Sequence, residues 1–179
     1  MGLRPEQRSH QVHLGDCPVH KSLQPFTKLL GEWEGEGYMS LYTPTRYPCS
    51  EHISIGHIGQ PSFTYSSMAH SQEAFRHRDM GFFFFTEATQ KMQFMVSDNT
   101  GHVCIMTGTP KVDSKKIEMV LETELCEGHP LPGKPQTIKV CREITLVDED
   151  TLMQKVYIYT TRKAELTLHT DMVYKRSAM

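Results

Sequence analysis

The sequence predicts an all-β fold, an antiparallel up-and-down β-barrel of about ten strands with one short N-terminal helix. Apolar and polar residues alternate with period two over most of the chain after Gly31, which is typical of half-buried strands. Clusters of Gly, Pro, Asn, Asp and Ser separate these segments and favour turns. Closure into a barrel is favoured over a sandwich because closure removes exposed sheet edges.

A single segment has a clear helical period. Its spaced residues fall at i, i+3, i+4 and i+7 and are Leu23, Phe26, Thr27 and Leu30. Ser22 is the expected N-cap, and Gly31 is suited to end the helix. The strands expected after this helix are residues 35–43, 50–56, 62–69, 80–86, 91–97, 102–108, 115–122, 136–147, 152–161 and 166–175.

Length and composition limit the domain organisation and the partners. With 179 residues and 38% apolar content, the chain suits one domain with a substantial core. Residues 1–17 have no apolar period and are expected to form a disordered tail, which leaves 18–179 as a single barrel domain. The formal charge of −2 supplies no basic field for nucleic acid or anionic membranes, so a small molecule is the expected partner.

Targeting signals and cysteines predict the compartment. The N-terminal region lacks an apolar stretch of signal-peptide length, and no segment approaches the roughly 20 apolar residues of a membrane helix. Five cysteines are an odd number without CxxC spacing, which favours reduced thiols over a disulfide framework. These observations predict a cytoplasmic or nuclear protein.

Two stretches carry large side chains on both faces of their expected strands. They are Met80–Phe85 and Met92–Val96. One explanation is a thick core or a helix lying on the sheet. The other is an apolar interior pocket, whose wall would suit the adaptable side chains of the chain's eleven methionines.

A Gly-rich segment opens the β region. Gly31, Gly35 and Gly37 do not form a phosphate loop, because a strand rather than a helix follows them. Glycines in a first strand either permit sharp coiling of the barrel or leave room for a planar ligand against the backbone. Trp33 beside them is interpreted as a core plug in preference to a ligand contact.

Two sets of histidines are candidate metal ligands. His10, His13, Cys17 and His20 are soft donors near the N-terminus, but a His-bearing tail explains them better than a zinc or copper site. His169 lies within the last expected strand. Its period-two partners form the more polar face, so the pattern alone favours a solvated or hydrogen-bonded histidine over a ligand.

Five motifs follow one another in order between about Pro25 and Arg176. They are Leu30-Gly31-Glu-Trp33-Glu-Gly35-Glu-Gly37, His57-Ile58-Gly59-Gln60-Pro61, His77-Arg78-Asp79-Met80-Gly81-Phe82, Asn99-Thr100-Gly101-His102-Val103 and Leu166-Thr167-Leu168-His169-Thr170-Asp171-Met172-Val173-Tyr174-Lys175. In these motifs and their order the chain resembles the nitrobindin family of small haem-binding β-barrels, which in animals also follow a THAP zinc finger.

This resemblance implies a site and an activity. The family's proximal haem ligand is the histidine of the final strand, which falls on His169 as axial ligand to the iron of a ferric haem b. The family's pocket threonine aligns with Thr43. Family members bind nitric oxide and isomerise peroxynitrite to nitrate, so a peroxynitrite isomerase is expected.

Several positions depart from the family's motifs. The proline of a Y-P-T motif is lost at Tyr42, a usual arginine is replaced by Phe84, and the H-L-H ending has become His169-Thr170-Asp171. A more polar proximal side and the loss of a propionate partner predict weaker haem affinity. The alternative function is a non-catalytic carrier of an apolar ligand, a fatty-acid-binding-like or lipocalin-like barrel with a degenerate haem site.

Overall fold

The computed structural model describes residues 17–40, 45–71, 75–128, 133 and 135–177. The described elements are η2 (Lys21–Leu29), β1 (Gly31–Ser40), β2 (Arg46–His57), β3 (Ser62–Ser71), β4 (Phe75–Thr86), β5 (Lys91–Asp98), β6 (His102–Gly108), β7 (Lys111–Val112), β8 (Ile117–Gly128), β9 (Thr137–Leu146), β10 (Thr151–Thr160) and β11 (Lys163–Arg176).

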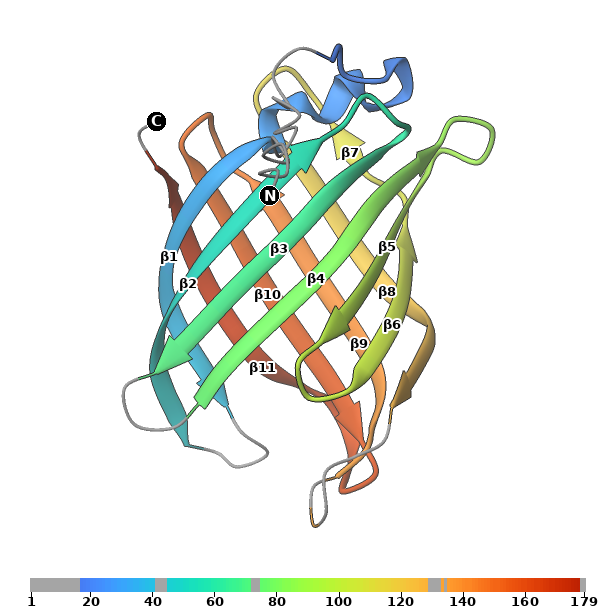
Figure 1. Cartoon of the computed structure of the whole chain (residues 1–179). Coiled ribbons are helices and arrows are strands. Elements are labelled where there is room, and N and C mark those ends of the chain that lie inside the picture. Colours follow the sequence, from blue (N-terminus) through green and yellow to red (C-terminus); the bar gives the residue numbers. More distant parts are fainter. Residues whose placement is uncertain (1–16, 41–44, 72–74, 129–132, 134, 178–179) are drawn as a thin grey trace, which may run out of the picture.

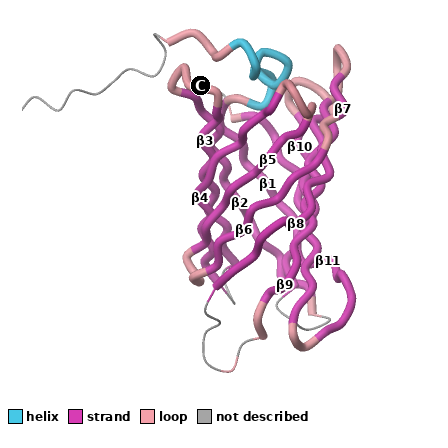
Figure 2. Tube along the Cα trace, turned by 90° about the vertical axis from the view of Figure 1, so that its right-hand side faces the viewer, coloured by secondary structure: helices cyan, strands magenta, loops and turns pink. Residues whose placement is uncertain are grey.

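Ten of these strands close into one antiparallel barrel (Figure 1). Neighbouring strands follow the order of the sequence, β1 pairs with β11, and β6 pairs with β8 to close the ring. Figure 2 shows β6 and β8 side by side in the wall that they complete. The short β7 pairs only with β8 among the described residues. The predicted fold class is confirmed, and each expected strand has its counterpart.

The helix differs from the expected one. It is a 3₁₀ helix that ends at Leu29, and its N-cap is His20, whose Nδ1 accepts a hydrogen bond from the Ser22 backbone N–H (3.3 Å). The assignment of Ser22 as N-cap was therefore wrong. Pro25 lies inside the helix and has no N–H to donate, which disfavours a regular α-helical ladder.

The helix covers one end of the barrel (Figures 1 and 2). Phe26 is buried there and contacts Phe85 of β4, with ring centroids 4.9 Å apart. Trp33 is fully buried, and its indole N–H donates to the Leu29 carbonyl (3.0 Å). Arg176 stacks its guanidinium over the Trp33 ring at 4.1 Å from the centroid. The interpretation of Trp33 as a core plug is confirmed.

Aromatic side chains fill the half of the barrel nearer the helix. Phe83 and Phe94 are stacked with centroids 4.1 Å apart, and Tyr65 meets both rings edge-on. On the outer face of β4, Phe82 is 45% and Met80 is 55% exposed. The stretches with large side chains on both faces therefore form a thick core inside the barrel and an uncovered apolar surface outside it.

The glycines of β1 allow close packing between two strands. The ring of Tyr174 on β11 lies against Gly35, and the Asp171 carbonyl and Met172 lie against Gly37, so a Cβ at either glycine would collide with them. These contacts occupy the space that a planar ligand would need at Gly35 and Gly37. The glycines therefore serve strand packing and coiling.

The cysteine prediction needs a correction. Cys104 and Cys126 form a disulfide, whereas Cys17, Cys49 and Cys141 are free. The two bonded residues are 22 positions apart, and the pairing of β6 with β8 places them directly opposite each other. That pairing depends on barrel closure, so the spacing of cysteines in the sequence could not reveal it.

The described residues contain no helix that is both long enough and apolar enough to cross a membrane.

Candidate functional site

The expected ligand His169 lies in a β-bulge of β11. In the pairing with β10, Val156 faces Thr170 and Tyr157 faces Leu168, which leaves His169 as an extra residue. A bulge of this kind places two residues opposite one and aims the extra side chain differently from strict alternation. Val156 and Thr170 are both buried, and His169 shares their position in the wall.

The bulge and the electrostatic influence of His77, Arg142 and Asp79 on His169 indicate that its imidazole faces the interior. His169 lies next to Thr170, which pairs with Met39 close to the end of β1. We call this barrel end, opposite η2 in Figure 1, the far end.

The Nδ1 atom of His169 is inaccessible to solvent, although the whole residue is only partly buried. Burial lowers the pKa of His169 to about 4 against an opposing hydrogen bond with the Ser40 backbone, and the positive charges of His77 and Arg142 lower the pKa further. The ring is therefore neutral at pH 7, as a metal-ligating histidine must be.

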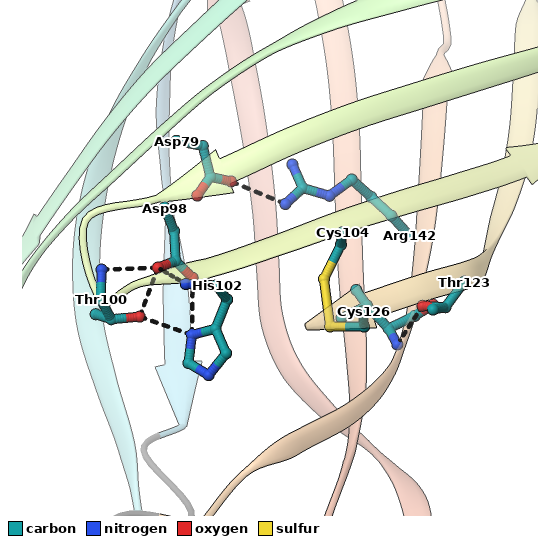
Figure 3. The surroundings of a disulfide bond; sticks show 9 residues. Asp79, Asp98, Thr100, His102, Cys104, Thr123, Cys126 and Arg142 are labelled. Atoms are coloured by element: carbon teal, nitrogen blue, oxygen red, sulfur yellow. Dashed lines mark hydrogen bonds and ion pairs between the residues drawn. A yellow bond between two sulfur atoms is a disulfide. The ribbon is translucent and has the colours of Figure 1, made fainter. Parts of the chain in front are cut away.

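A chain of buried polar side chains crosses the barrel between the aromatic core and the far end. Tyr174 donates from its hydroxyl to Glu51 Oε2 (2.6 Å), and Gln154 donates to the same hydroxyl (3.2 Å). Arg142 donates from Nη1 to Gln154 Oε1 (3.4 Å). The chain continues from Arg142 Nη2 to Asp79 Oδ2 at 2.9 Å (Figure 3). These bonds link five strands through the interior.

Asp79 is the electrostatic centre of this chain. It accepts from Arg142 on one oxygen and from His77 Nε2 on the other (2.8 Å). Burial alone would raise the pKa of Asp79, but the His77 hydrogen bond and the Arg142 charge outweigh it and lower the pKa to about 2. Burial would lower the pKa of His77, but Asp79 outweighs it and raises that pKa. Two basic groups thus share one carboxylate on the side of the interior that His169 faces.

Other predicted site residues lie apart from this interior or outside the described residues. Thr43 and Tyr42 fall in the range 41–44, which the structure does not describe. Phe84 is half-buried on the outer face of β4 beside Phe82, so its replacement of the family's arginine changes the outside of the barrel. Thr170 is buried next to His169, so a polar side chain lies beside the expected ligand.

The N-terminal donor set can be described only in part. His10 and His13 fall outside the described residues, Cys17 is exposed, and His20 Nδ1 lies 2.9 Å from the Ser22 hydroxyl at the start of η2. In the described part of the chain, no three His, Cys, Asp or Glu side chains are grouped to hold a metal ion.

The sequence interpretation missed the interior ion pair, although a signal for it was present. Arg142 alternates with the buried apolar residues Val140 and Ile144, and Glu51 alternates with Cys49 and Ile53. A charged residue on the apolar face of a strand must find a partner inside. That rule could have singled out both residues, but only the fold identifies the partners.

A known family matches this chain over nearly its whole length. The family is described as "THAP4-like, heme-binding beta-barrel domain", and its model matches residues 22–176. The chain belongs to this THAP4-like family. The resemblance to nitrobindins is thereby confirmed, and haem is the cofactor of the family.

Individual relatives of this THAP4-like domain are more distant. "Peroxynitrite isomerase THAP4" of Bos taurus is 29% identical over 160 residues, which cover 86% of this chain and 26% of that protein. The chain thus spans about a quarter of the length of the THAP4 proteins that it matches. "Peroxynitrite isomerase Rv2717c" of Arabidopsis thaliana is 28% identical over 134 residues, covering 73% of this chain and 75% of that protein.

A solved structure confirms the fold of the THAP4-like domain. The crystal structure of Rv2717c from M. tuberculosis superposes with a TM-score of 0.79 at 21% identity, covering 90% of this chain and 100% of that one.

The nitrogen donor of His169 fits the haem cofactor of the family. His169 presents a neutral imidazole to the interior, and neutral imidazole is a common axial ligand of haem iron.

Proposed function

We propose that this domain holds a ferric haem b through His169, binds nitric oxide there and isomerises peroxynitrite to nitrate. The observation that carries the proposal is the inward-facing, neutral imidazole of His169 in the bulge of β11. The names of the THAP4 and Arabidopsis relatives supply the reaction. When bound, ferric haem supplies a Lewis-acidic iron and a one-electron partner for the O–O bond of peroxynitrite.

The chain's own residues contribute position and charge. The bulge fixes the direction of His169, and burial keeps its imidazole neutral, which is the form that coordinates a metal. Asp79 favours the protonated form of His77, whose charge acts on His169 together with that of Arg142. When His77 is protonated, it and Arg142 together exceed the single negative charge of Asp79, which favours the entry of a small anion.

The aromatic core separates this site from the end that η2 covers. Phe83 and Phe94 are stacked inside the barrel and keep water out of that half. The same packing leaves little support for an apolar carrier, because the large side chains fill the interior near the helix. We also propose that Thr43 contacts the haem, on the basis of its alignment with the family's threonine, and that the protein works in the cytoplasm or nucleus.

Two experiments test the proposed function: a titration with hemin, and then a measurement of peroxynitrite decay by the hemin-loaded protein. We expect saturable binding of one hemin with a shifted Soret band, faster loss of peroxynitrite absorbance in stopped flow, and nitrate as the product. The protein without hemin is the control for the isomerisation. Displacement of a bound fatty-acid probe without an iron–histidine spectrum would instead indicate the carrier.

The pKa of His169 gives a pH prediction for the protein without haem. We expect its ring resonances in NMR to titrate near pH 4, because burial, His77 and Arg142 oppose protonation more strongly than Asp79 and the Ser40 backbone favour it. The unfolded chain takes up this proton near pH 6.5. The folded state therefore loses stability as pH falls from about 6.5 to about 4, and His169→Ala should reduce that loss. Titration of His169 near pH 6.5 would contradict the prediction.

A further inference from the structure

A pair of facing cysteines lies in the wall formed by β6 and β8. Cys104 and Cys126 are direct partners in the strand register, with Cα atoms 4.2 Å apart, and form a disulfide (Figure 3). Cys104 is buried, and Cys126 is partly buried against the core. Both side chains therefore face the interior of the barrel.

A second bulge is responsible for the direction of Cys126. In the β6–β8 register, Ile105 faces Leu125 and Met106 faces Thr123, which leaves Glu124 as an extra residue. Leu121 faces inward before the bulge, whereas Leu125 is 43% exposed after it. Strict alternation from Leu121 would turn Cys126 outward. The irregularity in β8 thus brings the second thiol to the inner face.

A histidine with an available nitrogen lies on the same inner face of β6. His102 Nδ1 lies 3.3 Å from Asp98 Oδ2 and 3.0 Å from the Thr100 hydroxyl. That hydroxyl already donates its proton to Asp98 Oδ1 (2.6 Å), so Nδ1 must carry the ring proton. His102 Nε2 is buried and has no hydrogen-bond partner among the described residues. It is therefore left as a proton acceptor, oriented by a carboxylate.

The ring of His102 lies close to both strands that carry the disulfide, β6 and β8. His102 precedes Cys104 by two positions, so the two side chains share one face of β6. Across the ladder His102 faces Gly128, and a Cβ on Gly128 would come within 2.8 Å of His102 Cδ2. The ring thus lies over the glycine that follows Cys126 on the same face of β8. Figure 3 shows this histidine group and the disulfide in one part of the barrel wall.

The remaining thiols are poorly suited to such a role. Burial raises the pKa of Cys49 to about 11, with a contribution from Glu51, and burial also raises the pKa of Cys141. Both thiols therefore stay protonated at neutral pH, and the thiol form is a weak nucleophile. Cys17 is exposed and has no paired cysteine among the described residues.

We propose that Cys104 and Cys126 are a redox-active dithiol that reduces peroxynitrite to nitrite, with His102 as the proton acceptor. Cys126 is the attacking residue because it is the less buried of the two. Its thiol proton passes to His102 Nε2 and then to the peroxynitrite anion. The Cys126 sulfur attacks the terminal peroxide oxygen, the O–O bond breaks, nitrite leaves, and Cys126 becomes a sulfenic acid.

Cys104 then completes the reaction. Its sulfur attacks the sulfenic sulfur of Cys126, the disulfide forms and water leaves, so that two thiols and one peroxynitrite yield one disulfide, one nitrite and one water. A small-molecule or protein thiol reductant returns the pair to the dithiol by exchange. This reaction needs no iron and gives nitrite, which separates it from the proposed isomerisation to nitrate.

The test uses the Cys17→Ser variant, fully reduced and free of hemin, so that the exposed thiol of Cys17 does not contribute. On mixing with peroxynitrite at neutral pH, we expect the loss of two thiols per chain, one nitrite formed and a Cys104–Cys126 bond in the peptide map. Hydrogen peroxide in a parallel arm should react at least about 10-fold more slowly, because hydroxide is a poorer leaving group than nitrite. An equal or faster rate with hydrogen peroxide would overturn the assignment of the oxidant.

Single substitutions assign the roles. Cys104→Ser should accumulate a sulfenic acid on Cys126 that dimedone traps, and Cys126→Ser should lose the reaction. His102→Gln should slow thiol oxidation about 100-fold, whereas His70→Gln, at an exposed histidine of β3, should not. Circular dichroism checks that each variant is folded. Reaction of Cys126 no faster than free cysteine, or an unchanged rate in His102→Gln, would overturn the proposal.

Discussion

Replacement of His169 by alanine is expected to weaken hemin binding by at least about 100-fold, because even residues that only support a metal ligand change affinity by about 10- to 100-fold. The shifted Soret band should disappear, since no nitrogen remains at this position to coordinate the iron. Absorption titration with hemin measures both effects. The barrel should stay folded, because His169 as a whole residue is only partly buried. Its removal also ends the cost of burying a group that can be protonated.

A matched control for this variant is His70→Ala. His70 is exposed on β3, so its removal should leave hemin affinity and the spectrum unchanged. Far-UV circular dichroism and urea unfolding of both variants check the fold. An unchanged Soret band and affinity in His169→Ala would show that another residue holds the iron.

Replacement of Arg142 by methionine is expected to give the largest loss of stability. The change leaves the buried Asp79 with His77 as its remaining basic partner among the described contacts. Removal of one member of a buried ion pair typically costs about 3–5 kcal/mol in the free energy of unfolding. Urea denaturation at pH 7 measures this cost. Lys116→Met, which breaks an exposed pair with Glu118, should change the midpoint little.

A double variant separates loss of the pair from loss of packing. Arg142→Met combined with Asp79→Leu removes both charges, so most of the lost stability should return. The pH dependence gives a further check. Asp79 has a folded-state pKa of about 2, so its contribution to stability is present above about pH 4 and is lost as pH falls toward 2. A single variant as stable as the wild type would contradict the importance of the pair.

Local patterns were sufficient to identify the strands of this protein. Alternation and turn clusters predicted every barrel strand, because each signal acts within a few residues. The first strand was placed too late, since its glycines obscure the alternation that begins at Gly31. The helix type was also missed, although Pro25 lies within its period.

The functional interior was predicted less well, for a physical reason. Alternation assigned His169 to the polar face of its strand, and only the family resemblance favoured it as a ligand. The bulge opposite Val156 turns that side chain inward. A bulge depends on how two strands pair, so one strand's sequence does not contain it. The same argument applies to Cys126 and the bulge in β8.

By itself, the sequence determined the all-β class, the order of the strands and the membership of a haem-binding family, because alternation and motifs are written along the chain. The tertiary structure alone decided which side chains meet inside the barrel. Asp79 and Arg142, or Cys104 and Cys126, become neighbours only when strands pair in a fixed register and the ring closes. Register and bulges depend on contacts between distant segments, and these are set by the folding of the whole barrel.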